Sequence, residues 1–155
     1  MASPYPLNIL VVEDEVLLAA ELAYLIEEAG CHEVGHAMSS AEALVMATEL
    51  RPDLALVDVH LRDGPTGIGL ARTIADTCGA VALFMTANVK RLPDDFAGAC
   101  GVIGKPYSGH GVKMALRYLD VCLRDGHAPG LPPAGLQLAP AWAHRWGLDD
   151  LPRTA

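Results

Sequence analysis

Short apolar runs alternate with helical patterns along most of the chain. The runs lie at residues 8–12, 33–38, 54–57, 81–85 and 101–104. A run such as LALV at 54–57, which is apolar on every side, is typical of a strand buried on both faces of a sheet. The sequence therefore predicts five strands.

Between these runs, apolar residues recur at helical spacing. A helix face over residues 18–29 is closed by a glycine, and a second helix over 40–50 has Ser40 as its predicted cap and ends before a proline. A shorter, weaker helix is predicted over RLPDDFAGAC, residues 91–100. Two further faces consist of Ile68, Ala71, Ala75 and Cys78, and of Val112, Ala115, Leu116, Leu119, Cys122 and Leu123.

Five strand-helix alternations within about 125 residues require right-handed crossovers and a parallel sheet that is covered on both faces. The small doubly wound solution is the α/β flavodoxin-like or CheY-like (βα)5 fold, with strand order 2-1-3-4-5. We predict this fold for residues 7–125, after a leader at 1–6. In such a sheet the ligand site lies at the carboxyl ends of strands 1 and 3, where the winding reverses.

Residues 126–155 differ in composition and form a C-terminal tail. This segment holds five of the eleven prolines and both tryptophans. About 30 residues cannot build a core of their own, so the tail must dock or extend. Trp142 and Trp146 are four residues apart, and a short helix would place both on one face. We expect an intramolecular clasp, and a contact with a second subunit or a partner is the alternative.

Composition mainly excludes functions. The chain is 52% hydrophobic and 19% charged, which is typical of a globular protein. A net charge of −8 argues against non-specific nucleic-acid binding. The sequence holds neither a membrane-spanning run nor a signal peptide, and its four scattered cysteines fit a reducing compartment, so we expect a cytoplasmic protein. Cysteine and histidine spacing does not favour zinc.

Polar side chains follow the predicted strands. Glu13 and Asp14 follow strand 1, Asp58 ends strand 3, Thr86 follows strand 4 and Lys105 follows strand 5. Three crowded carboxylates favour a hard divalent cation, and Mg²⁺ prefers carboxylate, water and phosphate oxygens. An aspartate beside such an ion can attack a phosphoryl group. We therefore predict that Asp58 becomes phosphorylated.

Each residue also has a simpler interpretation. Asp14 could cap the first helix, Asp58 could begin a turn, Thr86 could be a cap and Lys105 a solvated turn residue. A phosphate cradle of bare amides, as in flavodoxin-like nucleotide binders, is disfavoured by the acidic loop after strand 1.

The motifs VVEDE, LVDVHLRDGPTG, MTAN and GKPY stand in this order along the chain. On these motifs, residues 7–125 resemble the receiver domain of a two-component response regulator, and the DGPTG and KPY stretches are similar to receivers found with HWE-type sensor kinases. The resemblance implies a single-domain phosphorelay switch rather than an enzyme. Its partners would be a histidine kinase or phosphotransfer protein and a downstream protein target. The protein itself would act as a monomer or a homodimer.

The resemblance also implies roles. Asp58 would accept the phosphoryl group, and Asp14, Asp58 and the backbone carbonyl of His60 would bind Mg²⁺, with Glu13 acting through water. Lys105 would pair with the phosphoryl oxygens, and Thr86 would move to hydrogen-bond them. The Lys105–Pro106 bond is typically cis in this family.

The chain departs from the family at Val102, where many receivers carry an aromatic switch residue. Coupling of Thr86 to an aromatic residue is therefore in doubt, and activation would be transmitted through the fourth helix and its loop. Two other functions are alternatives to this interpretation. A phosphatase of the haloacid-dehalogenase type would need an aspartate where His60 stands, and the other alternative is a receiver-like interaction module that does not use phosphate.

Overall fold

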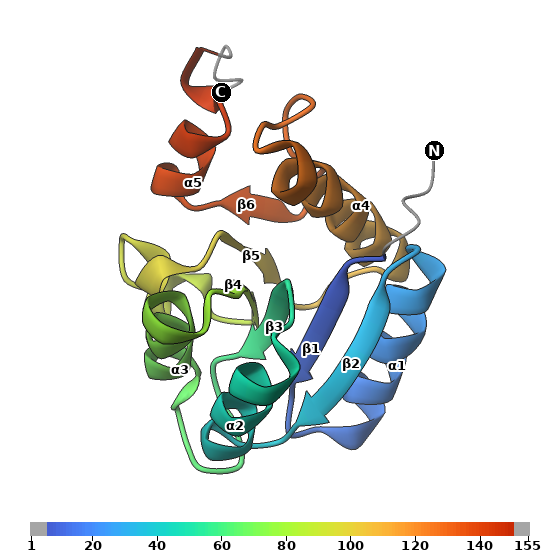
Figure 1. Cartoon of the computed structure of the whole chain (residues 1–155), viewed down its shortest axis with the longest axis vertical. Coiled ribbons are helices and arrows are strands. Elements are labelled where there is room, and N and C mark those ends of the chain that lie inside the picture. Colours follow the sequence, from blue (N-terminus) through green and yellow to red (C-terminus); the bar gives the residue numbers. More distant parts are fainter. Residues whose placement is uncertain (1–5, 151–155) are drawn as a thin grey trace.

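A six-stranded sheet runs through the centre of the part of the chain that the structure describes, residues 6–150 (Figure 1). The structure is a computed structural model. Most of the predicted leader and the last five residues of the tail lie outside the described residues.

The strand order is β2-β1-β3-β4-β5-β6. The first five strands pair in parallel, which confirms the predicted order 2-1-3-4-5, and β6 pairs antiparallel with β5. Because successive parallel strands are joined by crossovers, their carboxyl ends meet at one edge of the sheet. The strands are β1 (Asn8–Val12), β2 (His32–Ala37), β3 (Leu54–Asp58), β4 (Val81–Thr86), β5 (Gly101–Gly104) and β6 (Leu136–Leu138).

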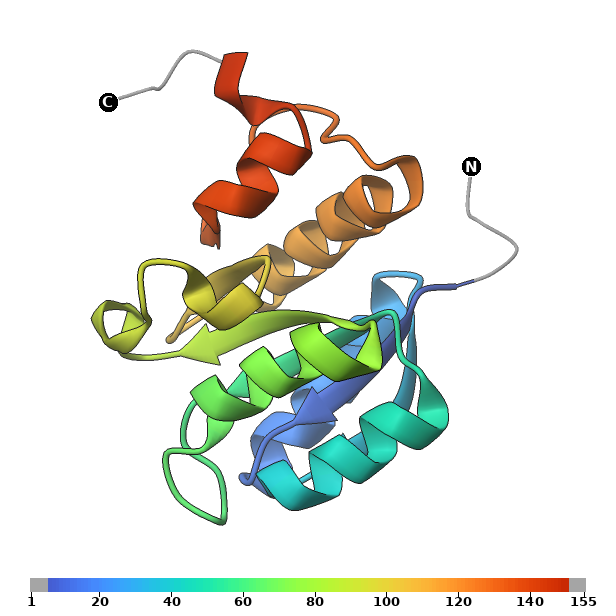
Figure 2. The ribbon, with the colours of Figure 1, turned by 60° about the vertical axis from the view of Figure 1, so that its left-hand side comes forward.

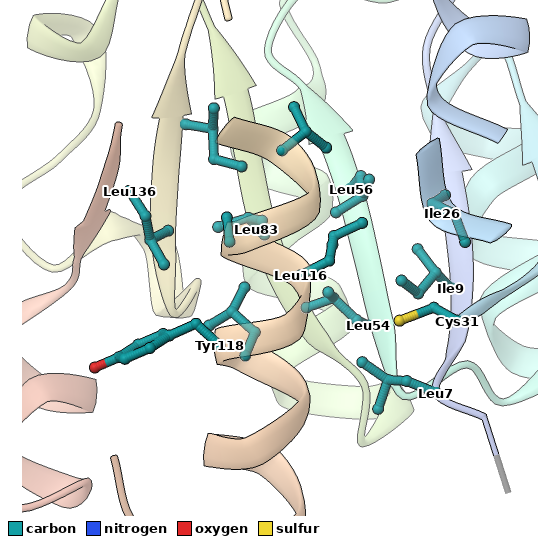
Figure 3. Packing of buried hydrophobic residues seen from close by; sticks show 14 of the residues in the cluster. Leu7, Ile9, Ile26, Cys31, Leu54, Leu56, Leu83, Leu116, Tyr118 and Leu136 are labelled. Carbon is teal, nitrogen blue, oxygen red and sulfur yellow. The ribbon is translucent and has the colours of Figure 1, made fainter. Parts of the chain in front are cut away.

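Helices cover both faces of the sheet (Figures 1 and 2). One hydrophobic cluster joins the sheet to α1 and α4, and the other joins it to α2 and α3. Figure 3 shows apolar side chains of β1, β3 and β4 gathered beside α4. The helices are α1 (Val16–Glu28), α2 (Ser40–Leu50), α3 (Gly67–Thr73), α4 (Gly109–Asp125) and α5 (Pro140–Arg145).

The capping residue of α2 differs from the prediction by one position. The hydroxyl of Ser39, and not that of Ser40, accepts a hydrogen bond from the backbone N–H of Glu42. Ser40 is instead held by Asp63, which accepts from both its backbone N–H and its hydroxyl. The third helical face is α-helical only to Thr73 and continues as a π-helical turn over Ile74–Cys78.

The predicted helix over residues 91–100 is wrong. This stretch of the connection between β4 and β5 holds only two 3₁₀ turns, Val89–Arg91 and Phe96–Gly98. The second turn has left-handed backbone angles, which a right-handed helix cannot contain. Tertiary contacts, described below, hold the turn in this form.

The tail folds back onto the domain, as the clasp hypothesis expects. Its strand β6, which the sequence pattern did not reveal, extends the sheet at β5. The short helix around the tryptophans is present as α5, and the two indole rings lie 5.1 Å apart. Trp146 is only 2% exposed and belongs to the cluster under α4. Within residues 6–150, no helix has the length and apolar character needed to cross a membrane.

Candidate functional site

Five sequence-predicted side chains converge at the carboxyl edge of the sheet. Glu13 and Asp14 follow β1, Asp58 and Thr86 are the last residues of β3 and β4, and Lys105 follows β5. β1 lies directly beside β3, and β4 and β5 follow in order. The topology alone therefore assembles residues that are up to 92 positions apart in the chain.

Three carboxylates form the acidic part of the site. Oxygen atoms of Glu13, Asp14 and Asp58 all lie within 4.8 Å of one another. Glu13 is buried, and the other two are half-buried. Asp14 does not cap α1, because the capping position is Glu15 and it makes no side-chain cap hydrogen bond. The simpler interpretation of Asp14 is therefore excluded.

The crowding shifts the ionisation of Glu13. Burial and, next, the hydrogen bond and negative charge of Asp58 raise its pKa to about 7. The positive charge of Lys105 acts in the opposite direction and only partly offsets these effects. The site thus holds more negative charge than the described side chains neutralise.

Lys105 is tied to two of the carboxylates. Its Nζ lies 3.0 Å from Oδ2 of Asp58 and 3.5 Å from Oε2 of Glu13. Burial alone lowers the pKa of an ammonium group, but the hydrogen bond and charge of Asp58, with a further contribution from Glu13, raise the pKa of Lys105 above its ordinary value. With a side chain only 20% exposed, Lys105 is a charged member of the site and not a solvated turn residue.

Two neighbours of Asp58 shape the loop that follows it. The backbone N–H of His60 donates to Oδ1 of Asp58 over 3.3 Å, a turn-like contact that leaves Oδ2 to Lys105. Gly67 packs so closely that a Cβ atom there would lie 2.1 Å from the carbonyl oxygen of Asp58. Only glycine fits at this position, and its backbone N–H donates to the carbonyl of Val59.

Thr86 is 3% exposed, and its hydroxyl accepts a hydrogen bond from the backbone N–H of Asn88 over 3.1 Å. The hydroxyl is therefore engaged by the chain that follows β4, which agrees with the simpler capping interpretation. An oxygen that accepts this bond still has its own proton to donate.

Sequence reasoning did not reveal two contacts of the site. The imidazole Nε2 of His36 donates to the carbonyl oxygen of Glu13 over 2.6 Å, while the backbone N–H of Glu13 donates to the carbonyl of Ala37. Nη1 of Arg91 lies 3.3 Å from Nε2 of His60. Neither pairing has a signal in the sequence, because both depend on how β2 and the 3₁₀ turn Val89–Arg91 meet the site.

Val102, which stands where many receivers carry an aromatic switch residue, is part of the hydrophobic core. It is 1% exposed and packs in the cluster on the α2 and α3 side of the sheet. Tyr107 is half-buried against the opposite cluster. The two faces of the sheet therefore separate these side chains.

Comparisons with known proteins agree with this geometry. The family model described as response regulator receiver domain matches residues 9–117. The chain is 36% identical over 110 residues to the transcriptional regulatory protein PdtaR of Mycobacterium tuberculosis, covering 66% of this chain and 51% of that protein. It is 31% identical over 118 residues to the phyllosphere-induced regulator PhyR of Methylorubrum extorquens, covering 75% of this chain and 44% of that protein.

A solved structure shows the same likeness. The anti-anti-sigma factor PhyR from Bartonella quintana aligns with a TM-score of 0.60 and 27% identity, over 72% of this chain and 46% of that chain. This chain thus spans about half the length of these three relatives.

Proposed function

Because the chain belongs to the response regulator receiver domain family, we propose that it acts in a phosphorelay as a protein switch whose phosphoryl acceptor is Asp58. The observation that carries the proposal is the pairing of Asp58 with Lys105 at 3.0 Å, beside two further carboxylates. A purely structural ion pair would not need Glu13 and Asp14 crowded against it, since like charges at this distance repel.

The reaction that fits the site is transfer of a phosphoryl group from a phosphohistidine donor. A carboxylate oxygen of Asp58 forms the new bond to phosphorus while the phosphorus–nitrogen bond of the donor breaks, and the donor imidazole keeps the electron pair and takes up a proton. Lys105 is positioned to exchange its contact with Asp58 for one with a phosphoryl oxygen. The hydroxyl of Thr86 can donate to another phosphoryl oxygen if the end of β4 moves toward it.

The donor set fits Mg²⁺. The three acidic side chains offer hard oxygen ligands within 4.8 Å of one another, and burial together with the neighbouring Asp58 raises the pKa of Glu13. Asp14, Asp58 and the backbone carbonyl of His60 would hold the ion, with Glu13 acting through water. Bound there, Mg²⁺ would supply positive charge to the phosphoryl oxygens.

We expect the output to be a protein contact and not catalysis or nucleic-acid binding. The solved relative from Bartonella quintana is an anti-anti-sigma factor, a name that describes a protein-directed output. The net charge of −8 is unfavourable for nucleic acid. A histidine kinase or phosphotransfer protein in the cytoplasm would be the donor, and whether the chain works as a monomer or a homodimer stays a prediction.

Acetyl phosphate with MgCl2 tests the proposal by intact mass. Wild-type protein should gain about 80 Da, the mass of one phosphoryl group, and Asp58→Asn should not. Asp76→Asn, an exposed aspartate away from the site, is the matched control and should label like wild type. Equal labelling of Asp58→Asn and wild type would exclude Asp58 as the acceptor.

A further inference from the structure

The connection between β4 and β5 contains a strained turn. Phe96, Ala97 and Gly98 have φ angles of 54°, 51° and 83°, so three successive residues are left-handed. For residues with a Cβ atom this region is unfavourable, and runs of such residues are rare. Backbone strain of this kind persists only where the surrounding structure imposes it.

The local sequence favours a different structure. Pro93 followed by Asp94 and Asp95 has the composition of a right-handed helix start, since proline suits the first helical position and acidic residues suit the first turn. The observed turn contradicts this preference. A conflict between local preference and tertiary structure marks a segment that has a second conformation within reach.

Two contacts hold the left-handed turn from outside. Nε1 of Trp142, on α5, donates to the carbonyl oxygen of Gly98 over 3.2 Å. Asp95 accepts from the backbone N–H of Ala97 over 3.0 Å and is itself held by the guanidinium of Arg72 on α3 through two contacts of 3.1 Å. Figure 2 shows α5 on the same side as this connection.

The tail segment that carries Trp142 is held against β5 by backbone contacts. β6 approaches β5 so closely that a Cβ at Gly101 would lie 2.4 Å from the carbonyl oxygen of Gln137. The backbone N–H of Ala139 extends the pairing by donating to the carbonyl of Cys100 over 2.8 Å. The Arg145 guanidinium stacks 4.2 Å from the centre of the Trp142 ring.

The strained connection begins at the phosphoryl-acceptor site. The backbone N–H of Asn88 is bonded to Thr86, and Arg91 contacts His60, two residues beyond Asp58. On the β5 side, a cavity of about 130 Å³ separates Pro106 and Tyr107, just after Lys105, from Ala134 and Gly135 of the tail. The connection that Trp142 holds therefore starts in direct contact with two site residues, Thr86 and His60.

We propose that residues 136–146, the strap, are an autoinhibitory element that locks the β4–β5 connection in its left-handed turn and is released when Asp58 is phosphorylated. Release by phosphorylation rests on the proposed function. The contact by which the strap holds the left-handed turn is independent of it. Motion of Thr86 toward a phosphoryl group pulls on Asn88 and weakens the contact of Gly98 with Trp142. The freed connection and the outer edge of β5 then become accessible to a protein target.

Amide hydrogen exchange on unphosphorylated full-length protein tests the lock. Trp142→Ala should speed exchange at residues 97–99 about tenfold, as expected for losing a hydrogen bond together with its packing. Trp142→Phe removes the N–H donor but keeps an aromatic ring and most of the packing, so a smaller rise of about threefold is expected. Leu131→Ala, at an exposed tail residue outside the strap, is the control and should match wild type.

Ala97→Gly provides a test in the opposite direction. Glycine tolerates the left-handed angles, and although it gives up the buried methyl group of Ala97, exchange at residues 97–99 should slow by up to about threefold. Unchanged exchange in both Trp142 variants would overturn the lock.

The trigger is tested by exchange on wild type treated with acetyl phosphate and MgCl2, with Asp58→Asn treated identically. Protein that carries the phosphoryl mass should exchange about tenfold faster at 97–99 and 136–138 than the variant. Equal exchange in phosphorylated protein would overturn release by phosphorylation. Absence of the mass gain would instead overturn the proposed function, and the Trp142 comparison would still decide whether the strap locks the turn.

Discussion

At the scale of single residues, Glu13 and Asp14 are neighbours in sequence with different environments. Glu13 is 2% exposed and has a pKa raised to about 7, because burial and the charge of Asp58 disfavour its ionised form. Asp14 is half-buried and reaches the same cluster of carboxylate oxygens. Glu13 therefore makes the folded protein sensitive to pH, and Asp14 is the side chain better placed to be a direct ligand.

We predict that Asp14→Ala weakens Mg²⁺ binding by about tenfold or more, since one direct carboxylate ligand is lost. Isothermal titration with MgCl2 measures the affinity. Asp53→Ala, at the opposite end of β3, is a control that should leave the affinity unchanged, although it loses a hydrogen bond with the backbone of Asn8. An unchanged affinity in Asp14→Ala would remove this residue from the coordination sphere.

A second residue-scale prediction concerns pH. Between pH 4.5 and about 7 the folded state keeps the proton of Glu13 and the unfolded state has lost it, so the free energy of unfolding should fall as pH rises through this window. The expected loss is about 3 kcal/mol.

Chemical denaturation in EDTA at several pH values measures this loss. Glu13→Gln, which cannot titrate, should show a flatter dependence, and excess Mg²⁺ should reduce the loss in wild type. A wild-type curve that is no steeper than that of Glu13→Gln would contradict the assignment.

At the scale of elements, the loop from β3 to α3 sets the position of Asp58. Hydrogen bonds from Ser40 and Thr66 hold the pKa of Asp63 below its ordinary range and tie this loop to α2. Gly67 lets the start of α3 lie against the backbone of Asp58. The acceptor is thus fixed by its backbone as well as by Lys105.

Two glycines of α3 give a matched pair of substitutions. Gly67→Ala places a Cβ against the carbonyl of Asp58 and should destabilise the protein by about 3 kcal/mol and slow labelling by acetyl phosphate. Gly69→Ala meets no atom within 4 Å and should stabilise α3 by up to about 1 kcal/mol. Denaturant titration of both variants measures the difference, and equal stabilities would show that the loop adapts to the added methyl group.

At the scale of the whole molecule, the tail is part of the folded unit. Leu136, Ala139 and Trp146 are all buried, and the backbone N–H of Ala128 donates to the carbonyl of Trp146, so the end of the tail returns to its beginning. Tyr118 on α4 donates to the carbonyl of Gly130 and anchors the proline-rich connection. The tail therefore completes the sheet edge and the cluster beside α4.

Truncation after Asp125 should leave labelling of Asp58 intact while lowering stability and exposing apolar surface. Removing buried Trp146 alone should cost about 3 kcal/mol or more, which corresponds to a lower melting temperature. Calorimetry measures the stability, binding of a hydrophobic dye measures the exposed apolar surface, and intact mass after acetyl phosphate treatment measures the labelling of Asp58. A truncated protein with the melting temperature and elution volume of the full chain would show that the tail contributes nothing to the fold.

The order of the parallel sheet and the residues at its carboxyl edge could be predicted from the sequence. The apolar runs identify the strands, and right-handed crossovers fix the order of those strands in the sheet. Asp58, Thr86 and Lys105 each stand at the end of such a run, so their place at the carboxyl edge follows without knowing any distant contact. The α1 and α4 faces were predictable for the same reason, since their apolar residues repeat at helical spacing.

The remaining features arise from contacts between distant segments. The three residues of β6 are too few to show a period, and they form a strand because β5 offers an unpaired edge. Residues 93–98 carry helix-start signals, yet Arg72 and Trp142 hold them in a left-handed turn. His36 and Arg91 reach the site through strand register and loop geometry. These features depend on contacts between segments far apart in the chain, and a local pattern carries no record of such contacts.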